Sequence, residues 1–319
     1  MSNETVLSRP RRGKKERRSK HPFRVALSQW RLYVLLIPAL LAVIIFHYIP
    51  MAGLSAAFKD LYLGQTFWEG TWVGWANFQR LFTGDYFWNI LKNTLSITFV
   101  QHFILWPLPI LFALLVHNSS SRGIRKFAQT ASYLPHLVSM VVIVSIINLF
   151  CHYETGIINI VFRNLGLEQI DFLGEEKYFL PMYFISDIWA TLGSSAVVYI
   201  AALSSVDTQL IEAATIDGAS KMKRIWHVDL PAIRPTIILL LIMGMGRMLS
   251  LGYEKVYLMQ NDLNLMTSEI IGTFVYKAGV LGGDYGYTTA ASLFNNVIGL
   301  ILVLVSNRIA KKFADISLI

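Results

Sequence analysis

The chain has 319 residues and a net charge of +8, and 54% of its residues are hydrophobic while only 15% are charged. This composition, with a mean hydropathy of +0.49, excludes an ordinary soluble domain and indicates an integral membrane protein. The single cysteine, Cys151, excludes an intrachain disulfide framework.

Residues 1–31 are predicted to form a basic cytoplasmic tail. A basic flank ahead of an apolar run holds that run's start on the cytoplasmic side and attracts anionic lipid headgroups. We therefore expect contact with membrane lipid and no binding of nucleic acid. The basic residues of the tail are Arg9, Arg11, Arg12, Lys14, Lys15, Arg17, Arg18, Lys20, Arg24 and Arg31.

The first predicted transmembrane helix covers 32–58. As a helix it would be about 40 Å long, which is enough to cross a hydrocarbon core of about 30 Å with some tilt. The run is too long for the core of a cleaved signal peptide, so we expect it to remain as an anchor. Kinks are expected at Pro38 and Pro50.

An external loop is predicted over 59–88. It contains Trp68, Trp72, Trp75 and Trp88, and tryptophan is typical of the interface between membrane and water. Two interpretations remain: an aromatic belt at the membrane surface, or a docking surface for an external protein.

The segment 89–312 is predicted to hold about five further transmembrane helices, followed by a cytoplasmic tail at 313–319. Loops rich in lysine and arginine remain in the cytoplasm. By this rule the loop 204–235 is cytoplasmic, whereas the acidic loop 152–179 and the polar segment 254–287 are external, and both termini are cytoplasmic. The predicted spans are 89–117, 131–151, 180–203, 236–253 and 288–307.

The cytoplasmic loop 204–235 contains a polar stretch that favours two short helices. Leu210, Ala213 and Ala214 share one helical face, and Asp217 followed by Gly218 is typical of a helix end. A second helix follows, with Met222, Ile225 and Trp226 on its apolar face and with Pro231 and Pro235 at the entry to the next span.

This stretch resembles the membrane-spanning permease subunits of binding-protein-dependent ABC importers. Those permeases carry Glu-Ala-Ala, then Gly-Ala three residues on, and a hydrophobic residue with proline about ten residues later. Ile225 stands where Phe is common, and Asp229 where Thr or Ser is frequent. The matching residues are Glu212, Ala213, Ala214, Asp217, Gly218, Ala219, Leu230 and Pro231.

The resemblance implies that these two helices are coupling helices, which in the family sit in a cleft of an ATPase subunit. Glu212 is then expected to anchor the loop electrostatically. Ala213 and Ala214 would allow close approach of the partner, and Gly218 would permit the turn.

Segments 32–60, 72–82, 252–263 and 306–312 resemble the oligosaccharide branch of these permeases, the LplB-like and MalF-like type. The resemblance implies an all-α type I ABC importer permease fold in a bacterial cytoplasmic membrane, with about six transmembrane helices and cytoplasmic coupling helices. The implied partners are a second related permease in a heterodimer, two ABC ATPase subunits, and an extracytoplasmic solute-binding protein that delivers an oligosaccharide. ATP and magnesium would bind to the ATPase subunits, and no cofactor to this chain.

The sequence lacks a Gly-x-x-x-x-Gly-Lys-Ser/Thr phosphate loop and any spacing typical of a metal site, so we expect no catalytic and no metal-binding residues. Three alternatives remain. They are an ion-coupled secondary carrier with Asp187 as its coupling-ion site, an intramembrane enzyme with Ser194 or Ser195 as nucleophile, and a membrane scaffold without transport.

Polar residues inside the predicted spans are candidates for a substrate path, because a charge in lipid needs a cavity or a partner. Asp187 and Arg247 each lie about 9–10 Å from the outer end of their span. We expect them to pair or to face one polar cavity, although a structural ion pair without sugar contact fits equally well. Aromatic planes stack on sugar rings and amides bind hydroxyls, which adds Trp189, Tyr199, Asn148, Tyr253, Asn295 and Asn296.

Overall fold

The computed structural model describes residues 30–66, 68–247 and 252–314, and most of these residues are helical. The chain divides into two compact units, Met1–Leu54 and Ser55–Ile319, and each is described by itself.

The first apolar span is one helical segment of 26 residues, Tyr33–Phe58. Pro50 lies in α3, directly after the π-helical η1, so the change of helix type stands next to the position where proline has no N–H to donate to the preceding turn. The segment consists of α2 (Trp30–Val43), the π-helical η1 (Ile44–Tyr48), α3 (Ile49–Met51) and the 3-10 helix η2 (Ala52–Phe58).

The loop that follows is folded. Strands β1 (Lys59–Asp60) and β2 (Thr71–Trp72) pair antiparallel, and α4 (Ala76–Thr83) comes next. Asn77 of α4 is buried, and its Nδ2 donates to the carbonyls of Ala57 and Lys59 over 3.0 and 2.8 Å. These bonds attach α4 to the start of the hairpin.

Five described helices are long and apolar enough to cross a membrane, and a bent pair of helices makes a sixth if it counts as one span. The second unit holds four of the five. Its first four helical segments are α5 (Asp85–Phe99), the π-helical η3 (Val100–Leu105), α6 (Pro107–His117) and α7 (Arg122–Tyr133). The 3-10 helix η4 (Leu134–Leu137), α8 (Met140–Cys151), α9 (Ile157–Asn164) and α10 (Glu176–Ser204) follow.

The chain then passes through two short helices into a further span. These elements are α11 (Thr208–Ile216), α12 (Lys221–Arg224), the π-helical η5 (Ile225–Asp229) and α13 (Leu230–Arg247). The last part comprises α14 (Tyr253–Met259), α15 (Leu265–Ser268), α16 (Ile271–Phe274), the π-helical η6 (Val275–Leu281) and α17 (Tyr285–Ala314).

Three segments differ from the prediction. The third span, predicted at 131–151, is a pair of helices bent by 100°, because Pro135 lies in the turn η4 and Ser139 caps a new helix, α8. The fifth span, predicted at 236–253, belongs to a helix that begins earlier and runs from Lys221 to Met245 through both prolines. The segment 254–287, predicted as a polar excursion, folds into helices with buried apolar side chains such as Val256 and Ile271.

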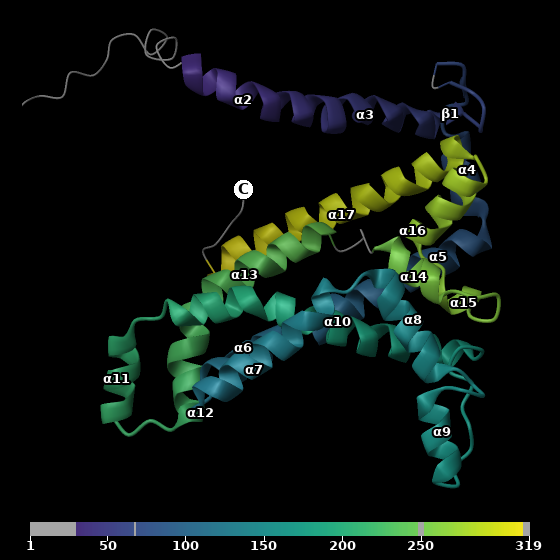
Figure 1. The fold of residues 1–319 in the computed structure, drawn as a ribbon. Helices are drawn as coiled ribbons and strands as arrows, with labels where there is room; N and C mark the ends of the chain where they lie inside the picture. The colour runs from purple at the N-terminus through teal and green to yellow at the C-terminus, as the bar shows by residue number, and fades with distance from the viewer. Residues whose placement is uncertain (1–29, 67, 248–251, 315–319) are drawn as a thin grey trace, which may run out of the picture. The chain divides into compact units, whose positions relative to one another are not determined.

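Helix α10 lies at the centre of the second unit (Figure 1). It packs against α6 and α7 along one side and also contacts α13, α14 and α15. Small side chains at Ala190, Gly193 and Ala196 are buried along it, which permits close helix approach. Helices α13 and α17 run side by side, while α11 and α12 project from one end of the unit (Figure 1).

Candidate functional site

The turn between α11 and α12 is defined by backbone hydrogen bonds. Asp207 caps the start of α11 by accepting a hydrogen bond from the N–H of Gln209 over 2.9 Å. At the other end Gly218 has φ +73°, and the N–H of Ala219 donates to the carbonyl of Ala214 over 2.9 Å. Together with the bond from the N–H of Gly218 to the Thr215 carbonyl (3.1 Å), this is a Schellman helix end, which favours glycine.

The surface of α11 and α12 is uncovered, since neither helix has a buried residue. Ile216 of α11 is 86% exposed and Met222 of α12 is 63% exposed. Because these side chains lie in the stretch 204–235, between two predicted spans, exposure to lipid does not account for them, and they indicate an interaction surface. Of the predicted coupling residues, Glu212, Ala213, Asp217, Gly218 and Pro231 are exposed, and Ala214 and Ala219 are half-buried.

The second short helix is attached to distant parts of the chain. The Nζ of Lys221 donates to the Oγ of Ser120 over 2.6 Å, and Asn118 donates its Nδ2 to the Oδ2 of Asp229 over 2.8 Å. Asp229 is buried. These contacts were not predicted, because the partners lie on the turn after α6, more than 100 residues away; the only signal was the departure from the family pattern at Asp229.

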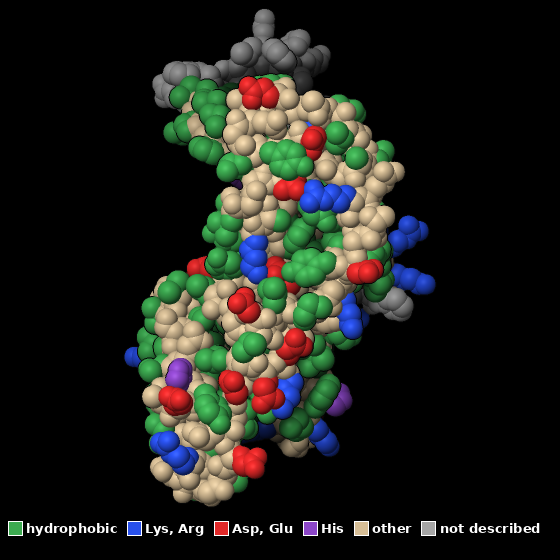
Figure 2. All heavy atoms as spheres, turned by 90° about the vertical axis from the view of Figure 1, so that its right-hand side faces the viewer, with side chains coloured by type: hydrophobic (Ala, Val, Ile, Leu, Met, Phe, Trp, Pro, Cys, Tyr) green, Lys and Arg blue, Asp and Glu red, His purple; other side chains and the backbone are tan. Residues whose placement is uncertain are grey.

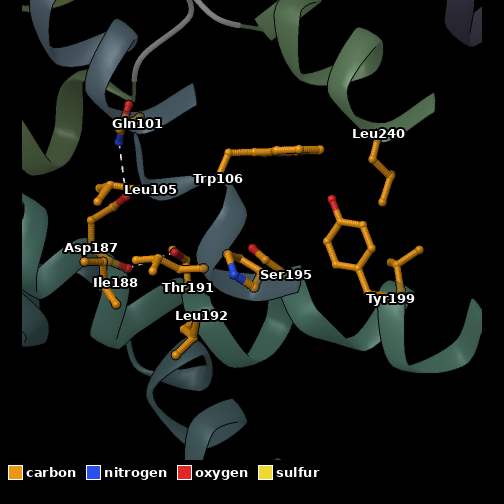
Figure 3. Close-up of a pocket in the computed structure, with 13 residues that line it drawn as sticks. Gln101, Leu105, Trp106, Asp187, Ile188, Thr191, Leu192, Ser195, Tyr199 and Leu240 are labelled. Atoms are coloured by element: carbon orange, nitrogen blue, oxygen red, sulfur yellow. Dashed lines mark hydrogen bonds between the residues drawn. The ribbon is translucent and has the colours of Figure 1, made fainter. Parts of the chain in front are cut away.

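A second candidate site is a cleft of about 300 Å³ between α10 and the broken helix α5–η3–α6. The wall formed by α10 is a row of polar side chains at every fourth residue, so that all of them share one face. The row consists of Asp187, Thr191, Ser195 and Tyr199, and Gln101 and Trp106 face it from η3 and the start of α6 (Figure 3).

Asp187 lies at one end of the cleft between two partners. Its Oδ2 accepts a hydrogen bond from the Nε2 of Gln101 over 3.1 Å (Figure 3). Its Oδ1 lies 3.2 Å from the Nζ of Lys255, whose side chain is almost fully buried. The same ammonium group donates to the carbonyl of Tyr183 over 2.9 Å and lies 4.3 Å from the centre of its ring. Burial lowers the pKa of Lys255, while the Asp187 carboxylate acts in the opposite direction.

The described partner of Asp187 is thus Lys255, in α14. Arg247, the predicted partner, is the last residue of α13, and its side chain lies outside the described residues. Lys255 was missed because it falls in the segment predicted to lie outside the membrane. Nothing in the sequence around Lys255 indicates that its side chain is buried.

The other candidate residues for a substrate path are dispersed. Of the predicted set, Asp187 and Tyr199 line the cleft. Trp189 lines a separate apolar groove of about 510 Å³ beside α8, and Tyr253 stacks on Tyr276 with ring centres 5.0 Å apart. Asn148 and Asn296 are exposed, and Asn295 is buried in α17. Among the described residues no group of three or more His, Cys, Asp or Glu could hold a metal ion.

The end of the unit that carries β1, α4 and α15 has a different surface from that of α11 and α12. Figure 2 shows acidic and basic side chains spread among exposed hydrophobic ones on this face. Arg80 of α4 pairs with Asp284 over 2.6 Å and lies 4.0 Å from the centre of the Tyr287 ring. This pair joins α4 to the start of α17.

Residues 106–315 match the family described as binding-protein-dependent transport system inner membrane component. The chain is 44% identical over 284 residues to the protein LplB of Bacillus subtilis, an alignment that covers 88% of this chain and 89% of LplB. It is 40% identical over 302 residues to the polygalacturonan/rhamnogalacturonan transport system permease protein YteP of the same organism, covering 95% and 94% of the two chains.

A solved structure of similar fold is that of a bacterial alginate ABC transporter in complex with a periplasmic protein that carries an alginate pentasaccharide. One chain of that complex superposes with a TM-score of 0.87 at 33% sequence identity. The match covers 93% of the chain described here and 99% of the chain in the complex.

Proposed function

This chain belongs to the family of inner-membrane components of binding-protein-dependent transport systems, and from that membership we propose its function. It is the permease subunit of an ATP-driven ABC importer and carries an oligosaccharide across the bacterial cytoplasmic membrane. The similar proteins named for polygalacturonan and alginate transport support a carbohydrate substrate.

The observation that carries this proposal is the uncovered pair of helices α11 and α12. Their exposed apolar side chains need a partner, and the Glu-Ala-Ala stretch within them resembles the coupling helices of ABC permeases. We assign that partner as an ATPase subunit, with a second copy serving a related permease. ATP and magnesium bind to those ATPase subunits, since this chain has no phosphate loop.

The cleft beside α10 is the proposed sugar path. Hydroxyl, amide and carboxylate groups along its wall can exchange hydrogen bonds with sugar hydroxyls, and Trp106 and Tyr199 offer aromatic surface at the other end. The cleft is small for an oligosaccharide. A second, related permease would complete the path, and an extracytoplasmic solute-binding protein would deliver the sugar.

The proposed orientation sets α11 and α12 in the cytoplasm, together with both termini. Three of the four residues of α12 are basic, namely Lys221, Lys223 and Arg224, and they support this orientation, as does the acidic loop between α9 and α10.

The test is purification of the tagged chain from its native membrane, followed by reconstitution into liposomes. We expect an ATPase to co-purify and sugar uptake to require ATP together with the loaded binding protein. An Ile216→Asp variant should lose the ATPase while remaining inserted. Uptake that survives removal of ATP but stops with an ionophore would instead establish the ion-coupled carrier.

A further inference from the structure

Asp229 is a buried carboxylate at the junction between the coupling helices and the span that follows. It is 2% exposed and ends the π-helical stretch η5. It lies four residues from both Ile225 and Ile233, which pack in the apolar cluster of α6, α10 and α13. A carboxylate in such a row is unfavourable unless it is hydrogen-bonded. Its partner, Asn118, lies at the end of α6 and donates over 2.8 Å.

The turn that contains Asn118 is held by further bonds. The Nδ2 of Asn118 also donates to the Leu114 carbonyl over 3.1 Å, and Arg125 of α7 donates its Nη2 to the Ser119 carbonyl over 2.9 Å. The turn is therefore fixed to both α6 and α7. Any force applied to Asn118 reaches both helices.

Two polar contacts join the second coupling helix to this turn. Lys221 reaches Ser120 at the exposed end, and Asp229 reaches Asn118 at the buried end. Positions 221 and 229 are about 12 Å apart along the helix. The exposed contact competes with water and holds weakly, whereas the buried one is shielded from water and is made by a charged acceptor.

We propose that the bond between Asp229 and Asn118 transmits motion of the coupling helices to α6 and α7, so that these helices move together with α13. This inference rests on the proposed function, because it assigns a role within coupling to an ATPase. Motion of α12 passes into α13 directly, since η5 continues the helix. Apolar packing alone would let α13 slide along α6. The directional hydrogen bond fixes the position of one helix along the other.

The first experiment measures coupling in the reconstituted transporter. Asp229→Ala and Asn118→Ala should each lower sugar uptake per ATP hydrolysed by about tenfold, the change expected for loss of a buried hydrogen bond to a charged group. The double variant should be no worse than either single one. The exchange Asp229→Asn with Asn118→Asp restores a donor and an acceptor and should recover most of the coupling. Ser120→Ala, which removes the exposed contact from the side of the turn and leaves α12 unaltered, is the matched control and should remain close to the parent.

The second experiment does not depend on transport. In a Cys151→Ser background, cysteines that carry spin labels are introduced at Lys126 of α7 and Lys223 of α12. The distance between the two labels is measured on the full chain in lipid nanodiscs. We expect one narrow distance in the parent and a broad distribution with Asp229→Ala. Identical distributions, or normal uptake per ATP in Asp229→Ala, would overturn the inference. A parent that shows no ATP-dependent uptake would instead overturn the proposed function, and the nanodisc measurement would still decide whether the bond holds these helices together.

Discussion

Gly193 of α10 lies where α7 crosses so closely that no side chain fits. A Cβ atom placed there would lie 2.3 Å from the carbonyl carbon and oxygen of Ser132 and 2.6 Å from the amide nitrogen of Tyr133. All three are backbone atoms, so no rotamer change can relieve the contact. The crossing of α7 and α10 therefore depends on the absence of a methyl group.

We predict that Gly193→Ala destabilises the chain by about 1–3 kcal/mol, because the two helices must separate. The measurement is the midpoint of thermal unfolding in detergent. Gly299→Ala in α17 is the control, since an added Cβ meets nothing within 4 Å there and alanine favours a helix. A Gly193→Ala protein as stable as Gly299→Ala would contradict the closeness of the crossing.

Gly218 presents the opposite case, with open space around it but a backbone conformation that L-residues rarely adopt. Asparagine is the side chain that tolerates φ near +73° best after glycine. We predict that Gly218→Asn retains stimulated ATPase activity, whereas Gly218→Arg loses it while remaining inserted, because a long charged side chain then occupies the docking surface. The assay is ATP hydrolysis by the assembled transporter with loaded binding protein. Unchanged stimulation in Gly218→Arg would remove the proposed docking role.

At the scale of elements, the main feature is the contact of three segments at the end of the cleft. Asp187 of α10 accepts from Gln101 of η3 and pairs with Lys255 of α14. Each partner comes from a different part of the chain, so the carboxylate links three helical segments that are far apart in the sequence. Because the Lys255 side chain is only 4% exposed, its charge depends on Asp187.

We predict that Lys255→Met and Asp187→Asn each destabilise the chain by about 1–3 kcal/mol, since each leaves the other group with an unpaired buried charge or an unmet hydrogen bond. The double variant should lose clearly less than the sum of the two single losses. Thermal unfolding of the four proteins gives this cycle. Strictly additive losses would show that the two groups do not interact.

The same elements show how much of the fold and of the candidate sites could be predicted from the sequence. Apolar runs and basic loops located most spans, and Asp217 with Gly218 located the end of α11, because these signals are local. Pro135 and Ser139 are signals for a break in the helix. From the sequence, however, the 100° bend between α7 and α8 could not be told from a kink within one span. The partners of Asp187 and Asp229 could not be found, since each depends on packing between segments 68 to 111 residues apart.

At the scale of the whole molecule, the proposed orientation has the coupling helices and the loop around β1 and β2 on opposite sides of the membrane. The chain has one cysteine, which is buried. A Cys151→Ser parent therefore allows single labels elsewhere, with Gln65 and Lys223 both exposed.

We predict that a membrane-impermeant maleimide labels Gln65→Cys in intact spheroplasts and labels Lys223→Cys only after permeabilisation. Basic residues near α12 favour its retention in the cytoplasm. The Cys151→Ser parent without a new cysteine gives the background. Labelling of Lys223→Cys from outside would reverse the orientation and exclude contact between α12 and a cytoplasmic ATPase.

The π-helical stretches have one more consequence. An α-helix advances by about 100° per residue, and a π turn contains an additional residue. Because the wider π turn accommodates that residue, deleting His227 from η5 would restore plain α geometry and leave the later side chains of α13 facing the same way. Ile233, 1% exposed, would stay in its cluster. The π turn therefore allows one more residue between Ile225 and Ile233, which pack in the same cluster, without changing the direction in which the span faces.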